Sequence, residues 1–165
     1  MTTPPPLPDP APADTIAAIE TSGRPAGFWI RLLATIIDSI LLVLLTLPIL
    51  LAIYGREYFF STALIKGPGD FLVSYVLPAV LVIFFWATWR GTPGKLILGL
   101  RLVDARTGAK LDLLQAVIRY LGYFVSTLPL CLGFLWIAFD SRKQGFHDKL
   151  ARTLVVKKAG SILAR

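Results

Sequence analysis

One apolar run, from Phe28 to Ile53, limits what this chain can fold into more than any other feature. As a helix rising about 1.5 Å per residue, its 26 residues are long enough to cross the roughly 30 Å hydrocarbon core of a bilayer. Two charges interrupt it: Arg31 near its start, and Asp38 about 15 Å from that start, near the midplane of a bilayer. A charge at that depth costs about 2.5–3.5 kcal/mol, so we expect other segments to supply a partner for Asp38.

Arg31 and Asp38 lie on one face of this helix, because seven residues make nearly two turns. Between them on that face are Ala34 and Thr35, which are small or polar, whereas the other faces carry Leu, Ile and Val. Small and polar residues on one side of a membrane helix are typical of contacts with other helices. The pattern allows two interpretations, namely charges that hold helices together and charges that line an ion or proton path.

The composition is that of a membrane protein. Of the 165 residues, 55% are hydrophobic and only 16% are charged. A net charge of +7 fits basic loops that face anionic lipid at the cytoplasmic side of a membrane better than it fits nucleic acid. The sequence shows no metal cluster, activated nucleophile or cofactor-binding loop, so we expect neither an enzyme nor a bound metal or cofactor.

The remaining segments follow from composition and length. Residues 1–25 are rich in proline and predict a disordered tail, residues 26–158 the membrane domain, and residues 159–165 a second tail. The run from Phe71 to Trp89 carries no charge in 19 residues and predicts a second spanning helix, kinked at Pro78.

The third apolar region, Leu113 to Phe139, contains Arg119 near its start and Pro129 and Gly133 midway. It either crosses once as a kinked helix or returns as a re-entrant pair of half-helices. A single crossing divides the fifteen Lys and Arg outside the apolar runs six to nine across the membrane, whereas a return divides them thirteen to two. The positive-inside rule favours the return, with both termini in the cytoplasm.

Short strands are expected outside the bilayer. Residues 96–112 alternate imperfectly around a turn signal and predict a small β-hairpin, to which a strand at Thr153–Lys157 could add. Gly91–Lys95 lacks the spacing of a phosphate-binding loop and predicts a turn at the membrane surface. The fold class is therefore an all-α membrane protein with two spanning helices, a third kinked or re-entrant helical segment, and a small cytoplasmic β-hairpin or sheet.

Three blocks of sequence occur in a fixed order: GFWIRLLATIID at 27–38, GTPGK at 91–95 and DSRKQGFHDKLART at 140–153. Together they resemble the RDD family of membrane proteins over roughly residues 25–158. The family is named for an arginine at the start of the first membrane helix, an aspartate within it and an aspartate toward the C-terminus. Arg31, Asp38 and Asp148 occupy these positions, and Arg152 stands where a glycine is common.

The resemblance implies a multi-pass protein of the bacterial plasma (inner) membrane, usually drawn with three membrane segments. It suggests transport of a small ligand or ion, including cation–proton exchange. An Asp38 carboxyl that gains and loses a proton would serve such exchange. We expect the cation that meets Asp38 to be Arg31 or Arg119, and a returning third region would also let Arg31 approach Asp148.

The structural interpretation leads to a different function. If Arg31, Asp38, Arg119 and Asp148 hold three segments together, the protein is a non-transporting membrane subunit or scaffold that binds a partner protein. A transporter with so few segments would need to form a homo-oligomer. We expect His147 to be a hydrogen-bonded cap at the membrane surface rather than a metal ligand. The supporting site residues are then Thr35, Lys95, Arg119 and His147.

Overall fold

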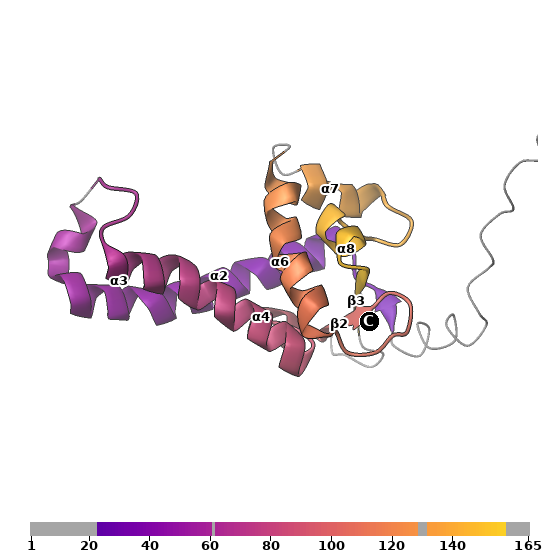
Figure 1. The fold of residues 1–165 in the computed structure, drawn as a ribbon. Coiled ribbons are helices and arrows are strands. Elements are labelled where there is room, and N and C mark those ends of the chain that lie inside the picture. Colours follow the sequence, from indigo (N-terminus) through magenta and orange to yellow (C-terminus); the bar gives the residue numbers. More distant parts are fainter. Residues whose placement is uncertain (1–22, 61, 129–131, 158–165) are drawn as a thin grey trace, which may run out of the picture.

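The described chain covers residues 23–60, 62–128 and 132–157 of a computed structural model (Figure 1). Most of both expected tails, and the expected kink at Pro129, lie outside these residues. One boundary differs from the expectation, because Arg24–Pro25 form a short strand, β1, and are not part of a tail. The backbone of β1 pairs with the far C-terminal strand, which fixes these residues in place.

A long helical hairpin makes up half of the fold. Its arms are long and apolar enough to cross a membrane, over Phe28–Phe59 and Pro68–Ile97, which confirms the two expected helices. The π-helical turn in the second arm ends at Val76, two residues before Pro78, whose missing N–H removes a helical hydrogen bond. The segments in chain order are α2 Phe28–Tyr54, η1 Gly55–Phe59, α3 Pro68–Phe71, η2 Leu72–Val76 and α4 Leu77–Trp89.

A three-stranded antiparallel sheet lies at one end of this hairpin (Figure 1). Its central strand is β3, Thr153–Lys157, with β1 on one side and β2, Leu100–Asp104, on the other. The register pairs Leu100 with Lys157 and Asp104 with Thr153. The strand expected at Thr153–Lys157 is therefore confirmed, including its place in a sheet.

The β-hairpin expected over residues 96–112 is wrong. Only its first half contains a strand, and the partner of that strand is β3. The second half leads into the next helix instead, because Leu111 is buried in the core and the Asp112 side chain caps the helix by accepting a hydrogen bond from Gln115 N at 2.6 Å. The start of the expected hairpin is also helical, as α5, Pro93–Ile97.

The third apolar region forms two helices, α6 at Leu113–Thr127 and α7 at Leu132–Phe139, bent by 99° relative to one another. Figure 1 shows α6 crossing the hairpin near the sheet rather than running alongside it. The two helices touch closely at Gly133, where a Cβ would lie only 2.6 Å from the Cα of Ser126. A short helix, α8 at Phe146–Leu150, then leads into β3.

The sheet constrains where the third region begins and ends. Its strands come from before α2, after α4 and after α7, so these three parts of the chain lie at the same end of the hairpin. Residues 113–139 therefore start and finish at that end. The buried apolar core lies here too, between the sheet and the helices, and includes Trp86, Leu100, Leu102, Ala116 and Val155.

Helix α6 has its polarity reversed relative to a helix of a water-soluble protein. It buries Arg119, Gly122 and Ser126 and exposes Leu113, Leu121 and Phe124, among others. Exposed apolar and buried polar side chains are the arrangement expected of a helix whose surroundings are lipid. Helix α6 therefore exposes an apolar surface, as the long hairpin does.

Candidate functional site

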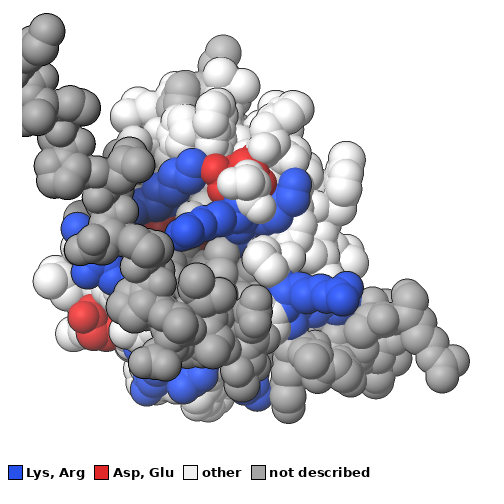
Figure 2. All heavy atoms as spheres, turned by 90° about the vertical axis from the view of Figure 1, so that its right-hand side faces the viewer, with Lys and Arg blue, Asp and Glu red and all other residues white. Residues whose placement is uncertain are grey.

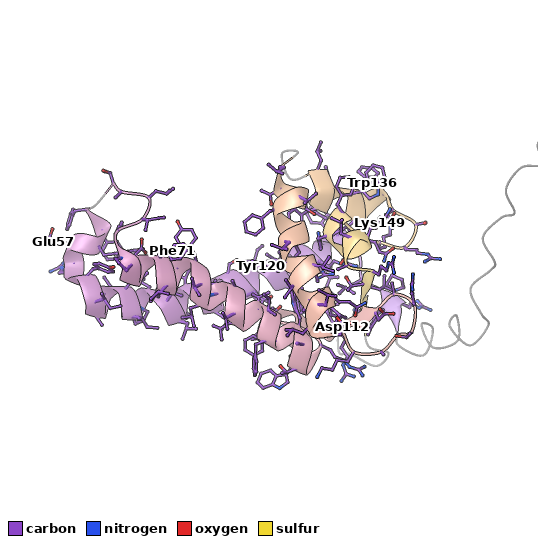
Figure 3. The ribbon with its side chains drawn as sticks, in the orientation of Figure 1. Glu57, Phe71, Asp112, Tyr120, Trp136 and Lys149 are labelled. Carbon is purple, nitrogen blue, oxygen red and sulfur yellow. The ribbon has the colours of Figure 1, made fainter. Side chains whose placement is uncertain are left out.

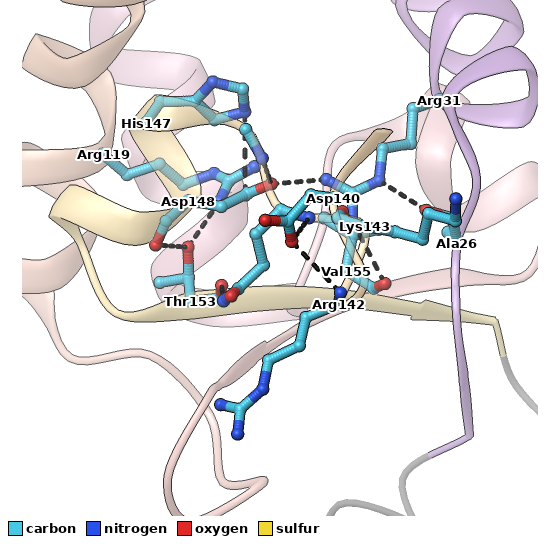
Figure 4. Close-up of polar contacts among 12 residues, drawn as sticks. Ala26, Arg31, Arg119, Asp140, Arg142, Lys143, His147, Asp148, Thr153 and Val155 are labelled. Carbon is cyan, nitrogen blue, oxygen red and sulfur yellow. Dashed lines mark hydrogen bonds and ion pairs between the residues drawn. The ribbon is translucent and has the colours of Figure 1, made fainter. Parts of the chain in front are cut away.

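Asp148, in the first turn of α8, is the centre of a buried cluster of charges (Figure 4). Its side chain is 0% exposed. The carboxylate oxygen Oδ2 lies 2.5 Å from Nη1 of Arg31, and Oδ1 forms a second ion pair with Nη1 of Arg119. The backbone N–H of Gly145 donates to Oδ2 at 3.0 Å. Helices α2, α6 and α8 thus meet at one carboxylate.

Arg31 reaches Asp148 from the first turn of α2 and also binds three carbonyl oxygens. Its Nε donates to Ala26 at 3.0 Å, and its Nη2 donates to Lys143 at 2.6 Å and to Val155 at 3.5 Å. These carbonyls belong to the segment after β1, the turn before α8, and β3. Arg31 therefore fixes the start of α2 to the sheet as well as to α8.

Arg119 reaches the same carboxylate from the middle of α6. Its Nη1 also donates to the hydroxyl of Thr153, at the first residue of β3. The guanidinium carbon lies 5.1 Å from the ring centre of Trp86 and 5.8 Å from that of Tyr123, which is within the range of cation–π attraction. Among the described residues, Arg119 Nε and Trp86 Nε1 are the buried side-chain nitrogens without a hydrogen-bond partner.

The charges of this cluster set the protonation of two groups. Burial acts to raise the pKa of Asp148, but the positive charges of Arg119 and Arg31 outweigh it and hold that pKa well below its usual range. Burial, assisted by the same arginines, lowers the pKa of His147 from 6.5 to about 3. His147 is therefore neutral at pH 7, and its Nε2, 3.6 Å from Asp148, forms no ion pair.

His147 is hydrogen-bonded as expected, and its side chain is enclosed by the protein. Its side chain is buried, and Nδ1 lies 3.1 Å from the hydroxyl of Ser126 on α6. The same hydroxyl accepts a hydrogen bond from the backbone N–H of His147 at 3.2 Å. Close packing allows this, because a Cβ on Gly122 would lie 2.9 Å from the Cα of His147.

Asp38 lies in a second site, on the same face of α2, and its partners come from the GTPGK block. The hydroxyl of Thr92 donates to Oδ2 at 2.5 Å, and the backbone N–H of Gly94 donates to Oδ1 at 2.7 Å. Nζ of Lys95 lies 3.7 Å from Oδ2 and donates to Thr92 Oγ1 at 3.1 Å. Lys95 is thus the cation that meets Asp38.

The expectation that Arg31 or Arg119 meets Asp38 is wrong, because both guanidiniums are bound to Asp148. The expected surface turn at Gly91–Lys95 is also inaccurate, because residues from Pro93 on form α5 and pack against α2. Asp38 contacts Gly94 of α5, so the two lie at the same depth along the hairpin. Asp38 therefore cannot lie near the midplane of a bilayer while the GTPGK block lies at its surface.

The contact between α5 and α2 requires a glycine at position 94. A Cβ there would lie 2.5 Å from the carbonyl oxygen of Ala34 and 2.9 Å from the carboxyl carbon of Asp38. The sequence did contain a signal for α5, since Thr92 followed by Pro93 is a typical start of a helix. The prediction of a turn at these residues leaves Thr92 and Gly94 out of the expected site.

A cavity of about 950 Å³ lies beside both sites, between α2, α4, α6 and α7. Most of its lining is apolar. Its polar lining includes Arg31, Asp38, Lys95, Arg119 and His147, whereas Asp148 does not contribute. The Asp38 side chain is 20% exposed, so among the two family aspartates it is the one that a small solute could reach. Thr35 also lines the cavity, and its hydroxyl donates to the carbonyl of Arg31 at 3.0 Å.

Comparison with known proteins places the chain in a family. The model of the RDD family matches residues 25–152. The chain belongs to the RDD family. The described part of this RDD protein contains no group of three or more His, Cys, Asp or Glu that could hold a metal ion.

Several relatives cover most of the chain. The Bacillus subtilis protein named uncharacterized protein YxaI is 34% identical over 153 residues, which are 82% of this chain and 99% of that protein. Uncharacterized membrane protein YteJ of the same organism is 30% identical over 79% of this chain and 80% of its own length. The proline-rich antigen of Mycobacterium leprae is 25% identical over 77% of this chain and 59% of its own. No solved structure matches the chain.

The three residues that name the RDD family divide between the two sites. Arg31 and Asp148 form the buried ion pair, and Asp38 binds the GTPGK block. Arg152, where a glycine is common in the family, has a φ of 52°. This left-handed conformation is one that glycine adopts without strain.

We predict that Asp148→Asn will destabilise the protein by about 3–5 kcal/mol, because it leaves two buried guanidiniums without a counter-charge. Asp140→Asn is the matched control. Asp140 pairs with Lys149, whose side chain is 46% exposed, so its loss should cost about 1 kcal/mol or less. Denaturant unfolding of the detergent-purified variants measures both. Equal losses in the two variants would contradict the central role of Asp148.

The buried neutral His147 predicts a loss of stability on mild acidification. The unfolded chain binds a proton near pH 6.5 and the folded one only near pH 3, so stability is complete above pH 6.5 and falls below it. The slope should approach about 1.4 kcal/mol per pH unit. His147 is the single histidine, so between pH 6.5 and 4.5 the slope should be nearly absent in His147→Gln. If the unfolding midpoint changed with pH equally in both proteins, the assignment of this pH dependence to His147 would be refuted.

Proposed function

We propose that this RDD protein is a small membrane transporter in which Asp38 binds the transported cation or proton. The observation that carries the proposal is the contrast between the two aspartates. Asp148 is fully buried and held by two guanidiniums, so its carboxylate serves structure. Asp38 is partly exposed at the cavity, and within the described part of the chain its one charged partner is Lys95 at 3.7 Å, beyond normal hydrogen-bonding distance.

The Asp38 site could exchange a cation for a proton through charge balance. A monovalent cation that enters beside Asp38 brings a second positive charge close to Lys95. Lys95 then withdraws from Asp38, and a cation and a proton that compete for this one carboxylate are exchanged for one another. The Thr92 hydroxyl, which now accepts from Lys95, would offer an oxygen ligand to the incoming cation.

We further propose that the sheet end faces the cytoplasm in a bacterial inner membrane. Its loops carry ten Lys and Arg over residues 90–110 and 142–157, whereas the far loop has Arg56 and Lys66 balanced by Glu57 and Asp70. The positive-inside rule supports this orientation. The pairing of β3 with β1 supports a third region that returns to the side from which it started.

A path across the bilayer needs more than one copy of this chain. In the described residues, the third region covers the hairpin only near the sheet, and the other half of the hairpin exposes apolar side chains along its length. Two helices cannot enclose a polar path. We therefore propose a homo-oligomer whose hairpins together line the route from Asp38 to the opposite surface.

We predict that Asp38→Asn will abolish cation-dependent proton flux in vesicles reconstituted with the purified protein. The amide keeps an oxygen for Gly94 N–H but carries no charge to bind the cation. Asp112→Asn is the matched control, because Asp112 is exposed and asparagine also caps helices well. Flux is measured with a pH-sensitive dye as each alkali cation is added.

Folded yield and unfolding midpoint are measured beside the flux. Flux that survives in Asp38→Asn would refute the assignment of Asp38. No flux from well-folded native protein with any cation would refute transport and favour the scaffold that binds a partner protein.

The orientation is tested by cysteine labelling of the full chain in intact cells, with Cys131→Ser as the background. Figure 3 shows Glu57 at the end of the hairpin away from Trp136 and Lys149. We predict that a membrane-impermeant thiol reagent will label Glu57→Cys from outside but will label Lys110→Cys only after permeabilisation. The reverse pattern would contradict the proposed orientation.

A further inference from the structure

A second hollow, of about 280 Å³, lies on the surface at the sheet end, away from the Asp38 cavity. Four of its six lining residues are cationic, and none is acidic. Figure 2 shows Lys and Arg side chains gathered on this face of the molecule, with acidic side chains among them. The residues that line this basic pocket are Ala105, Arg106, Arg142, Gln144, Lys149 and Arg152.

The basic pocket is assembled from three turns that are distant in sequence. Arg106 follows β2, Arg142 lies between α7 and α8, and Arg152 lies between α8 and β3. Two hydrogen bonds hold these turns together. The Ala105 N–H donates to the carbonyl of Arg152 at 2.9 Å, and Gln144 Nε2 donates to the carbonyl of Thr153 at 2.8 Å. These two bonds hold the backbone of the three turns together before any ligand arrives.

The guanidiniums of this pocket are available to a ligand. The side chains of Arg106, Arg142 and Arg152 are exposed, and in the described part of the chain no hydrogen bond or ion pair engages their guanidiniums. In Figure 4 the Arg142 side chain points away from the Asp148 cluster. Lys149 differs, because its Nζ is paired with Asp140 at 2.5 Å. Asp104 lies near the same turn but accepts hydrogen bonds from Arg106 N, Thr107 and Gln115.

Arg152 is held at a cost. Its φ of 52° lies in the left-handed region, which strains the backbone of a residue that carries a Cβ. Glycine would avoid that strain, so the guanidinium is the feature that an arginine adds here. That guanidinium lines the basic pocket beside those of Arg106 and Arg142, where it can contribute to binding an anion.

We propose that the basic pocket binds the phosphate of an anionic phospholipid. Guanidinium groups match phosphate oxygens in pairs, and several converging on one anion are typical of phosphate recognition. The apolar surface of α7 supports a lipid as the source, since Trp136 on that helix is 46% exposed and its ring centre lies 5.7 Å from Lys149 Nζ. Acyl chains of a lipid held at the pocket would meet this surface. The pocket is separate from Asp38, and the proposal does not depend on transport.

The test uses the full chain in detergent, with phosphatidic acid and phosphatidylcholine of identical acyl chains as probes. Lipid retention is measured by native mass spectrometry and as a shift in unfolding midpoint. Phosphatidic acid should bind preferentially, and Arg142→Gln combined with Arg152→Gly should weaken that binding by about tenfold or more. Arg152→Gly relieves the strained backbone, so a well-folded protein is expected from that change.

Arg101→Gln is the matched control, because Arg101 is exposed on β2 at the same end but does not line the pocket. It should change binding less than about twofold. An equal loss in the control would show attraction to general surface charge and overturn the site. Inorganic phosphate at the concentration of the lipid should not displace it. Displacement would make free phosphate the ligand and overturn the lipid assignment.

Discussion

The shared carboxylate of Asp148 is the interaction on which the sheet end of this RDD protein depends. Its two arginines lie 117 and 29 residues away in sequence. Removing three charges from water costs several kcal/mol per ion, and a pair with incomplete contacts would not recover that cost. Here both guanidiniums also bind neighbouring groups on the sheet, so the same contacts that satisfy the charges fix α2 and α6 against β3.

The need to satisfy buried polar groups also explains the second aspartate. Asp38 is met by one hydroxyl, one backbone N–H and one ammonium group, all supplied by Thr92, Gly94 and Lys95. The short helix α5 therefore packs against α2 at the position of the charged residue Asp38. The two family aspartates have become chemically different. Asp148 is fully buried between two guanidiniums, whereas Asp38 faces a cavity and, among the described residues, is paired with the ammonium group of Lys95.

The surface of the protein has two regions, one apolar and one basic. The long hairpin, α6 and α7 expose leucine, phenylalanine and tryptophan, while the turns around the sheet expose arginine and lysine. In water, a folded chain would bury the apolar side chains, and burying the arginines and lysines would cost free energy. The boundary between the two surfaces runs close to Trp136 and Lys149, and this is where the basic pocket opens.

The sequence by itself determined the parts of the structure that depend on local pattern. The apolar runs gave both arms of the hairpin, since their length and lack of charge leave a helix as the only low-energy form in lipid. The strand at Thr153–Lys157 and the family residues Arg31, Asp38 and Asp148 were also evident. Only the tertiary structure decided which cation meets which carboxylate, and that β2 pairs with β3. Helical periodicity tells which face a charge occupies but not what lies opposite, because that partner is set by packing between segments up to 117 residues apart.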